Sequence, residues 1–447
     1  MKTHKLLVLL LCLLFAHKTY SQKIGGGELN PGIYTNEKSI EEFQDLKFGL
    51  SIHWGPNVIA GQEISWSRGK ETPQTEYDNF YKQFNPTKFN ADEWVDLMTD
   101  FGMKYVIITT KHHDGFSMWH SDYSDYDIAA TPFQRDILRE LSDACQKKGI
   151  IFGTYYSTLD WYHPDYQPYG HGGPGNMFPR YKDTPNQNRY WIYAKNQLRE
   201  LVTKYNSKII QFDGDWDSTW THQIGSDFYL YLRKIKDEVI VNSRTDIGRR
   251  PPPPYNENES WRADIFAGDF EERERIVGYK PKVNSRAPYP WQAWVTVDKT
   301  QWSWKPDPKL LSASEIITDL IKTVGEGGNY LINIGPKPDG TFEPVIVANM
   351  KEVGKWVKGH AESIYGTRAG DFFEEGKFTS TKKGNANYLF VYNTSLKEVS
   401  LNGSHKKLIS IKDEAGKPVR FKQVADKISF KISYIKVGVP SVYALSF

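Results

Sequence analysis

Short apolar runs alternate with amphipathic helical stretches along most of this chain, and this alternation limits the possible folds more than any other feature. The runs are rich in β-branched and aromatic residues, as strands buried on both faces of a parallel sheet are. Runs of this kind predict strands at residues 47–54, 104–110, 150–157, 208–214, 238–244, 263–270, 291–297 and 330–335.

Helices are predicted between several of these runs, at residues 90–102, 135–149, 188–206 and 312–328. Asn90 and the acids after it are typical of a helix start, and Gly149 after two lysines is typical of a helix end. Strands and helices in this order predict a (β/α)8-like barrel, with a gap in its helical layer at the Pro-rich connection around 245–262. The alternative is an open doubly wound sheet, but no G-x-G-x-x-G follows the first strand.

The sequence pattern changes after residue 367, where the alternation of strands and helices ends. Short alternating strands separated by Lys- and Gly-rich turns predict a small all-β sandwich domain over residues 368–447. The barrel then occupies residues 23–367 and forms the catalytic domain.

The N-terminus has the pattern of a secretory signal peptide over residues 1–22. Lys2 and Lys5 precede an apolar run, from Leu6 to Phe15, that is too short to span a membrane. We therefore expect export, to the periplasm or the cell exterior. A net charge of +3 gives no electrostatic reason to expect nucleic acid as a partner, and no membrane span is expected after signal removal.

Polar side chains gather where the predicted strands end. They are His53, His112 and His113, Tyr155, Asp213, Arg244 and the acidic segment 268–274. The carboxyl ends of barrel strands form one mouth, so these side chains are expected to surround a common active site.

Metal sites fit these residues poorly. "DGDWD" begins like a calcium loop, but Ser218 and Ile224 stand where such a loop needs Gly and Glu. A zinc site from His53, His112 and His113 is disfavoured because adjacent strand residues point to opposite faces. No metal and no cofactor is expected.

A pair of carboxylates fits better. Hydrolysis of a glycosidic bond needs one carboxylate at the anomeric carbon and one carboxylic acid that protonates the leaving oxygen. Asp213 ends a strand and precedes Gly214, where a substrate can approach the backbone closely. The 14 Trp and 27 Tyr residues also suit stacking on sugar rings.

The segments "KFGLSIHWG", "TTKHHDGFSMW", "FDGDW" and "GGNYLINIGPKPDG" together resemble the α-L-fucosidases of glycoside hydrolase family 29. The resemblance runs in order from about residue 40 to residue 367, and the β-rich tail resembles the family's C-terminal domain. It implies a secreted retaining exo-glycosidase that hydrolyses terminal α-L-fucosyl residues of glycans by double displacement, without a cofactor.

The resemblance also implies roles for individual residues. Asp213 corresponds to the nucleophile and Glu274 to the acid/base, with Glu271 and Glu272 as neighbouring rivals for the second role. The sugar-binding residues it implies are His53, His112, His113, Arg244, Tyr155, Trp302 and Trp66. Trp66 matches the Trp of a Glu-Trp pair; Ser65 stands at the Glu position, and Glu63 is the nearest acid.

Three positions depart from the family pattern: Ser51 and Gln211 replace aromatic residues, and Gln292 replaces a Glu. The two aromatic residues help to form the family's pocket for the C6 methyl of fucose, so Ser51 and Gln211 predict a more polar or roomier pocket. One alternative is therefore an α-L-galactosidase or other L-sugar hydrolase. Another is a non-catalytic glycan-binding protein on this scaffold. The expected partner is a fucosylated or L-galactose-containing oligosaccharide or polysaccharide.

Overall fold

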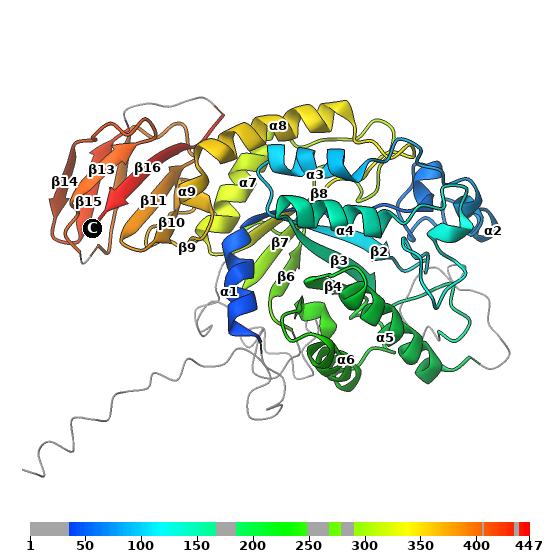
Figure 1. The fold of residues 1–447 in the computed structure, drawn as a ribbon. Coiled ribbons are helices and arrows are strands. Elements are labelled where there is room, and N and C mark those ends of the chain that lie inside the picture. The colour runs from blue at the N-terminus through cyan, green and yellow to red at the C-terminus, as the bar shows by residue number, and fades with distance from the viewer. Residues whose placement is uncertain (1–34, 167–184, 248–267, 279–289, 405, 433–437) are drawn as a thin grey trace, which may run out of the picture.

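The computed structural model describes residues 35–447 apart from 167–184, 248–267, 279–289, 405 and 433–437. Its larger sheet is formed by β1 (Phe48–Ile52), β2 (Tyr105–Lys111), β3 (Ile151–Ser157), β4 (Ile209–Asp213), β5 (Ile240–Val241), β6 (Glu271–Glu274), β7 (Trp291–Thr296) and β8 (Asn329–Asn333). The strands are parallel and follow the order β5-β4-β3-β2-β1-β8-β7-β6 (Figure 1).

The sheet closes into a barrel between β5 and β6. An isolated parallel bridge joins Asn242 to Phe270, and the Ser243 backbone N–H donates to the Phe270 carbonyl at 2.8 Å. The predicted (β/α)8-like barrel is therefore confirmed.

The described residues place β6 after the sixth predicted run. Residues 263–267 lie outside the described residues, and β6 is formed by the charged segment Glu271–Glu274 that follows the predicted run. The sequence of β6 consists of three glutamates and an arginine, so it lacks the apolar pattern by which the other strands were predicted. It is stable here because a buried arginine faces the acids that point into the barrel.

The helices are α1 (Glu37–Leu46), α2 (Gln74–Tyr77), α3 (Ala91–Asp100), α4 (Ile137–Lys148), α5 (Gln187–Thr203), α6 (His222–Ile235), α7 (Ala313–Gly325), α8 (Pro344–Gly359) and α9 (Ala361–Ile364). The Asn90 side chain accepts from the Glu93 backbone N–H, as its predicted capping role requires. Gly149 ends α4 in the left-handed conformation, with φ of 70°. Among the described residues no α-helix lies between β5 and β7, and most of the connection at which the gap is predicted, residues 248–262, lies outside them.

Helix α1 covers the end of the barrel at which the strands begin. Its Phe43 ring lies 4.5 Å from the ring of Phe270 and 5.9 Å from the ring of Tyr105, measured between ring centroids. The apolar cluster that fills the barrel interior contains Ile40, Phe43, Tyr105, Ile107, Tyr155, Ile209, Ile240, Phe270, Trp294 and Leu331. This helix therefore closes the barrel floor and leaves the opposite end as the mouth.

The C-terminal part is an all-β sandwich, as predicted. Its strands are β9 (Arg368–Ala369), β10 (Phe378–Lys383), β11 (Ala386–Val391), β12 (Glu398–Leu401), β13 (Ser410–Asp413), β14 (Phe421–Val424), β15 (Lys427–Lys431) and β16 (Ser441–Ser446). A five-stranded and a three-stranded sheet share one apolar core, to which Leu389 and Ile428 contribute from opposite sheets. The other face of the larger sheet packs Phe390 and Val442 against Ile321 of α7 (Figure 1).

No helix among the described residues combines the length and the apolar character that crossing a membrane requires.

Replacing Phe43 by Ala is expected to lower the free energy of unfolding by about 3–5 kcal/mol, because it leaves a cavity in the barrel floor. Urea unfolding followed by tryptophan fluorescence measures the change. The matched control is Ile192→Ala on α5, whose side chain is exposed and whose loss should cost less than about 0.5 kcal/mol. Equal effects of the two substitutions would contradict the role of α1 as the floor.

Candidate active site

A pocket of about 300 Å³ opens at the carboxyl ends of the barrel strands. It is lined by His53, Trp66, His112, His113, Asp213, Trp216, Glu274, Trp294 and Trp302. Ligand sites begin at roughly this volume, so the pocket suits one monosaccharide. Most of the site residues that the sequence predicts are thus brought together at the mouth of the barrel.

Asp213 is the last residue of β4 and its side chain is buried. One carboxylate oxygen forms an ion pair with Arg244 Nη1, and the other accepts a hydrogen bond of 2.7 Å from the Tyr155 hydroxyl. Burial by itself would raise the pKa of this carboxyl, but the guanidinium beside it outweighs burial and holds the pKa below its usual value. The Asp213 carboxylate is therefore ionised at neutral pH.

Arg244 lies among three carboxyl groups from β4 and β6. Its Nε is 2.7 Å from Glu272 Oε1, its Nη2 is 2.7 Å from Glu274 Oε2, and its Nη1 pairs with Asp213. One guanidinium cannot balance three carboxylates in a buried site, so protons remain on part of the set. Burial raises the pKa of Glu272 to about 8 and also raises the pKa of Glu274 above its usual value.

The alternation of β6 separates the three rival acids. Glu271 lies on the outer face and pairs with Arg273 at 3.0 Å. Glu272 points inward, has no exposed side-chain surface, and accepts from the Asn242 amide at 2.9 Å. Glu274 also points inward, keeps 30% of its side chain exposed, and is the only one of the three that lines the pocket.

His53 presents an unprotonated nitrogen to the pocket. Its Nδ1 lies 2.8 Å from Asn333 Oδ1, and the Asn333 amide nitrogen donates to the Trp302 carbonyl at 2.7 Å. That second bond fixes the amide oxygen toward His53, so Nδ1 carries the proton and Nε2 accepts. Burial lowers the pKa of this imidazole to about 4, so the ring is neutral at physiological pH.

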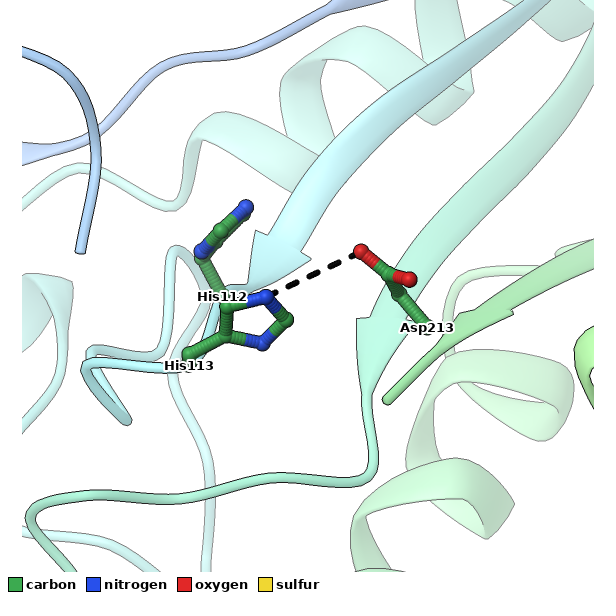
Figure 2. A group of neighbouring side chains, drawn as sticks. All are labelled: His112, His113 and Asp213. Atoms are coloured by element: carbon green, nitrogen blue, oxygen red, sulfur yellow. Dashed lines mark ion pairs between the residues drawn. The ribbon is translucent and has the colours of Figure 1, made fainter. Parts of the chain in front are cut away.

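His113 is fixed in the same tautomer by Ser157. The Ser157 hydroxyl donates to the Leu159 carbonyl at 2.9 Å, so its oxygen accepts from His113 Nδ1 at 2.6 Å. The unprotonated Nε2 then lies 3.8 Å from Asp213 Oδ2 (Figure 2). Burial lowers the pKa of His113 to about 4.

His112 and His113 do not point to opposite faces as predicted, because β2 ends at Lys111 and both residues lie beyond the strand. Their ring centroids are 4.2 Å apart and both rings line the pocket (Figure 2). Ligand atoms of His112, His113 and Asp213 lie within 4.8 Å of one another, a spacing that could hold a metal ion. However, Arg244 already supplies the cation that faces Asp213, and a metal ion there would be repelled by it.

Glu63, which was predicted to bind the sugar, and Ser65 contact residues of the pocket wall instead. Glu63 is half-buried, and its carboxylate accepts from the backbone N–H groups of Trp302 and Ser303 at 2.8 and 3.1 Å. It therefore fixes the loop that carries Trp302 and does not line the pocket. Ser65, at the family's Glu position, places its Oγ 2.6 Å from His112 Nδ1.

Ser51 and Gln211 lie one layer below the pocket and do not line it. Gln211 Oε1 accepts from Gln292 Nε2 at 3.3 Å, and Gln292 Oε1 accepts from the Tyr105 hydroxyl at 2.7 Å. Ser51 Oγ accepts from the Trp294 indole N–H at 3.0 Å. The three departures from the family pattern are thus partnered inside the barrel, and Trp294 supplies an aromatic wall beside Ser51.

Sequence reasoning missed four residues of the site. Trp216 and Trp294 line the pocket, while Asn333 and Ser157 set the protonation of the two histidines. Trp216 lies three residues after Asp213 in the loop beyond β4, and Trp294 shares the inward face of β7 with Gln292. Their positions near the carboxyl ends of β4 and β7 could have indicated that both tryptophans belong to the site. The hydrogen bonds of Asn333 and Ser157 could not be predicted in this way, because they form only in the closed barrel.

Comparisons with known proteins agree on one family. A sequence model described as "Alpha-L-fucosidase" matches residues 30–362. Human tissue alpha-L-fucosidase is 32% identical over 374 residues, which are 77% of this chain and 74% of that protein.

Solved structures are similar over nearly the whole chain. An alpha-L-fucosidase of family GH29 from Bacteroides thetaiotaomicron gives a TM-score of 0.79 at 27% identity, covering 95% of this chain and 97% of that one. A second structure from that organism, a trapped covalent intermediate in complex with 2-fluoro-fucosyl fluoride, gives a TM-score of 0.79 at 26% identity, covering 93% and 97%.

The buried His113 predicts a pH dependence of stability. Its pKa is about 4 in the folded protein against 6.5 ordinarily, so between these values the unfolded chain binds a proton that the folded protein does not. The free energy of unfolding therefore falls as the pH drops from 6.5 to 4. Between pH 6.5 and pH 4 the free energy of unfolding of the unsubstituted protein should fall by on the order of 3 kcal/mol more than that of His113→Gln. Urea unfolding of both proteins at several pH values measures the difference; a constant difference would contradict the burial of a neutral imidazole.

Proposed function

The chain belongs to the alpha-L-fucosidase family, glycoside hydrolase family 29, and we propose that it removes terminal α-L-fucosyl residues from glycans. The observation that carries this proposal is the pairing of Asp213 and Glu274 across one guanidinium at a pocket of monosaccharide size. An ionised carboxylate and a carboxyl of raised pKa in one cleft are the two groups that glycoside hydrolysis requires.

In the first step of the proposed mechanism, the Asp213 carboxylate attacks the anomeric carbon of the bound sugar. The bond from that carbon to the glycosidic oxygen breaks, and Glu274 transfers its proton to the departing oxygen. Arg244 contacts both carboxyl groups and fixes their relative position before the substrate arrives.

In the second step Glu274, now ionised, removes a proton from a water molecule. The water oxygen attacks the anomeric carbon, the ester bond to Asp213 breaks, and the sugar leaves with its configuration retained. The covalent intermediate trapped in a similar bacterial structure supports this route.

The pocket walls favour fucose. The acceptor nitrogens of His53 and His113 suit sugar hydroxyl groups, and the rings of Trp294 and Trp302, 4.4 Å apart between centroids, offer apolar surface to a methyl group. The alternative of L-galactose was motivated by Ser51 and Gln211. Neither residue lines the pocket, and Ser51 Oγ and Gln211 Oε1 are bonded to Trp294 and Gln292, so neither is placed to meet a C6 hydroxyl held in the pocket.

We propose that the natural substrate is a fucosylated oligosaccharide or polysaccharide met outside the cytoplasm. The support for export is the signal pattern of residues 1–22, a segment that lies outside the described residues. The sandwich packs on α7, so its proposed role is to buttress the barrel.

The purified protein is expected to hydrolyse an aryl α-L-fucoside with a kcat/KM about ten- to a hundredfold higher than that for the matching α-L-galactoside. The extra hydroxyl of galactose would be buried without a partner, which costs about 1–3 kcal/mol. Release of the phenol measures both reactions. Equal or reversed rates would overturn the assignment of fucose, and binding of fucose without hydrolysis of either substrate would favour a non-catalytic glycan-binding protein.

Replacing Glu274 by Ala is expected to lower turnover of natural linkages by about 10²–10⁴-fold, since the leaving oxygen loses its proton donor. Azide should restore turnover of an aryl fucoside and yield a fucosyl azide of retained configuration. Asp213→Asn should abolish hydrolysis without such rescue. Glu272→Ala is the matched control: it should weaken activity by releasing Arg244, but azide should not restore it. Rescue of Glu272→Ala and not of Glu274→Ala would reverse the assignment of the acid/base.

A further inference from the structure

Arg275 follows the proposed acid/base directly and has an unusual backbone. Its φ is +57°, in the left-handed region that residues other than glycine seldom adopt. Its backbone N–H donates to the Trp294 carbonyl at 2.7 Å, so the chain is held at this point beside a wall of the pocket. Such backbone conformations persist where the surrounding structure enforces them, and they are concentrated at functional sites.

The Arg275 side chain packs against Trp302, at the edge of the pocket that we call its rim. The residue is exposed, and the carbon of its guanidinium is 4.9 Å from the centroid of the Trp302 ring. Trp302 lines the pocket, and the positive charge of Arg275 acts there, because it lowers the pKa of both His53 and Glu274. The attraction between a guanidinium and an indole keeps the group close to the ring and leaves its N–H donors for another partner.

Arg275 differs from Arg273 and Arg244 because it has no ion-pair partner among the described residues. Arg273 pairs with Glu271, and Arg244 pairs with the buried carboxyl groups. None of the ion pairs among the described residues includes Arg275. The Arg275 guanidinium therefore has no anionic partner within the described part of the chain, and it lies against Trp302 at the pocket.

We propose that Arg275 and Trp302 form a subsite for an acidic group, a carboxylate or a sulfate ester, on the sugar from which fucose is released. Both groups present paired oxygen atoms that a guanidinium binds through two parallel N–H donors. This inference rests on the proposed function, because the sugar next to the fucose occupies this rim only if Glu274 protonates the bond between them.

An acidic group at this subsite would also affect the acid/base. Burial raises the pKa of Glu274, while Arg244 and Arg275 lower it and Asp213 raises it. Glu272 lies beneath it on the same strand face. An anion bound to Arg275 would offset one of the two cations, so Glu274 would keep its proton to higher pH during cleavage of an acidic substrate.

The test compares two aryl α-L-fucosides whose phenols differ only in a side group, a carboxylate in one and its methylamide in the other. The quantity measured is the ratio of kcat/KM for the acidic substrate to kcat/KM for the neutral one. Comparing this ratio between variants cancels the chemical difference between the phenols. A third substrate with a sulfate ester distinguishes the two sources of negative charge.

Arg275→Met is expected to lower the ratio by about fivefold at low salt, the upper range for an exposed ion pair. Arg275→Lys should keep part of the preference, because it keeps the charge and loses the fork. Arg273→Met removes the same charge from the outer face of β6 and should leave the ratio unchanged. The preference of the unsubstituted protein should shrink at about 1 M salt, where screening is strong.

The outcomes separate the two proposals. If the unsubstituted protein hydrolyses both fucosides and Arg275→Met leaves the ratio unchanged, the acidic subsite is overturned and the fucosidase function stands. If neither fucoside is hydrolysed, the proposed function fails. In the unsubstituted protein, activity should fall at a higher pH on the alkaline side for the acidic substrate than for the neutral one. Arg275→Met should remove this difference in pH. A difference that survives the substitution would contradict the link to Glu274.

Discussion

One buried guanidinium, that of Arg244, connects the chemistry of this protein to the closure of its barrel. It pairs with Asp213 at the end of β4 and with Glu272 and Glu274 on β6, next to the point where Asn242 and Phe270 join the two edges of the sheet. A buried charge that loses its partner is strongly destabilising, so these strands depend on the complete set. The same set separates the pKa values of the acids, because the guanidinium favours an ionised Asp213 while burial favours protons on the glutamates.

The barrel could be predicted because most of its strands are buried on both faces and their sequences are therefore apolar. The exception was β6, where Glu272 and Glu274 point inward and the partner that neutralises them comes from a distant part of the chain. A local pattern contains no information about such a partner. Helix α1 was not predicted although Asn36 caps it, and only its role as the floor depends on residues far away in sequence.

The candidate site could be predicted as far as strand ends and motif resemblance locate side chains. Asp213, Glu274 and the three histidines lie together at the pocket. The resemblance did not indicate how far below the pocket each side chain lies. Ser51 and Gln211 were expected at the sugar, but each lies two residues before a pocket residue on the same strand face and so a layer lower, where Trp294 and Gln292 partner them. Gln211 Nε2 is buried without an acceptor among the described residues, so this polar layer leaves one donor unsatisfied.

The floor of the barrel also has a consequence for how the chain folds. Phe43 belongs to the first helix of the described chain, yet it packs on Tyr105 and on Phe270, the second of which is synthesised only after five further strands. Contacts between such distant positions form late, and surfaces that wait for them stay exposed in the nascent chain. The apolar face of α1 is therefore a segment that a chaperone would have to shield until β6 has emerged.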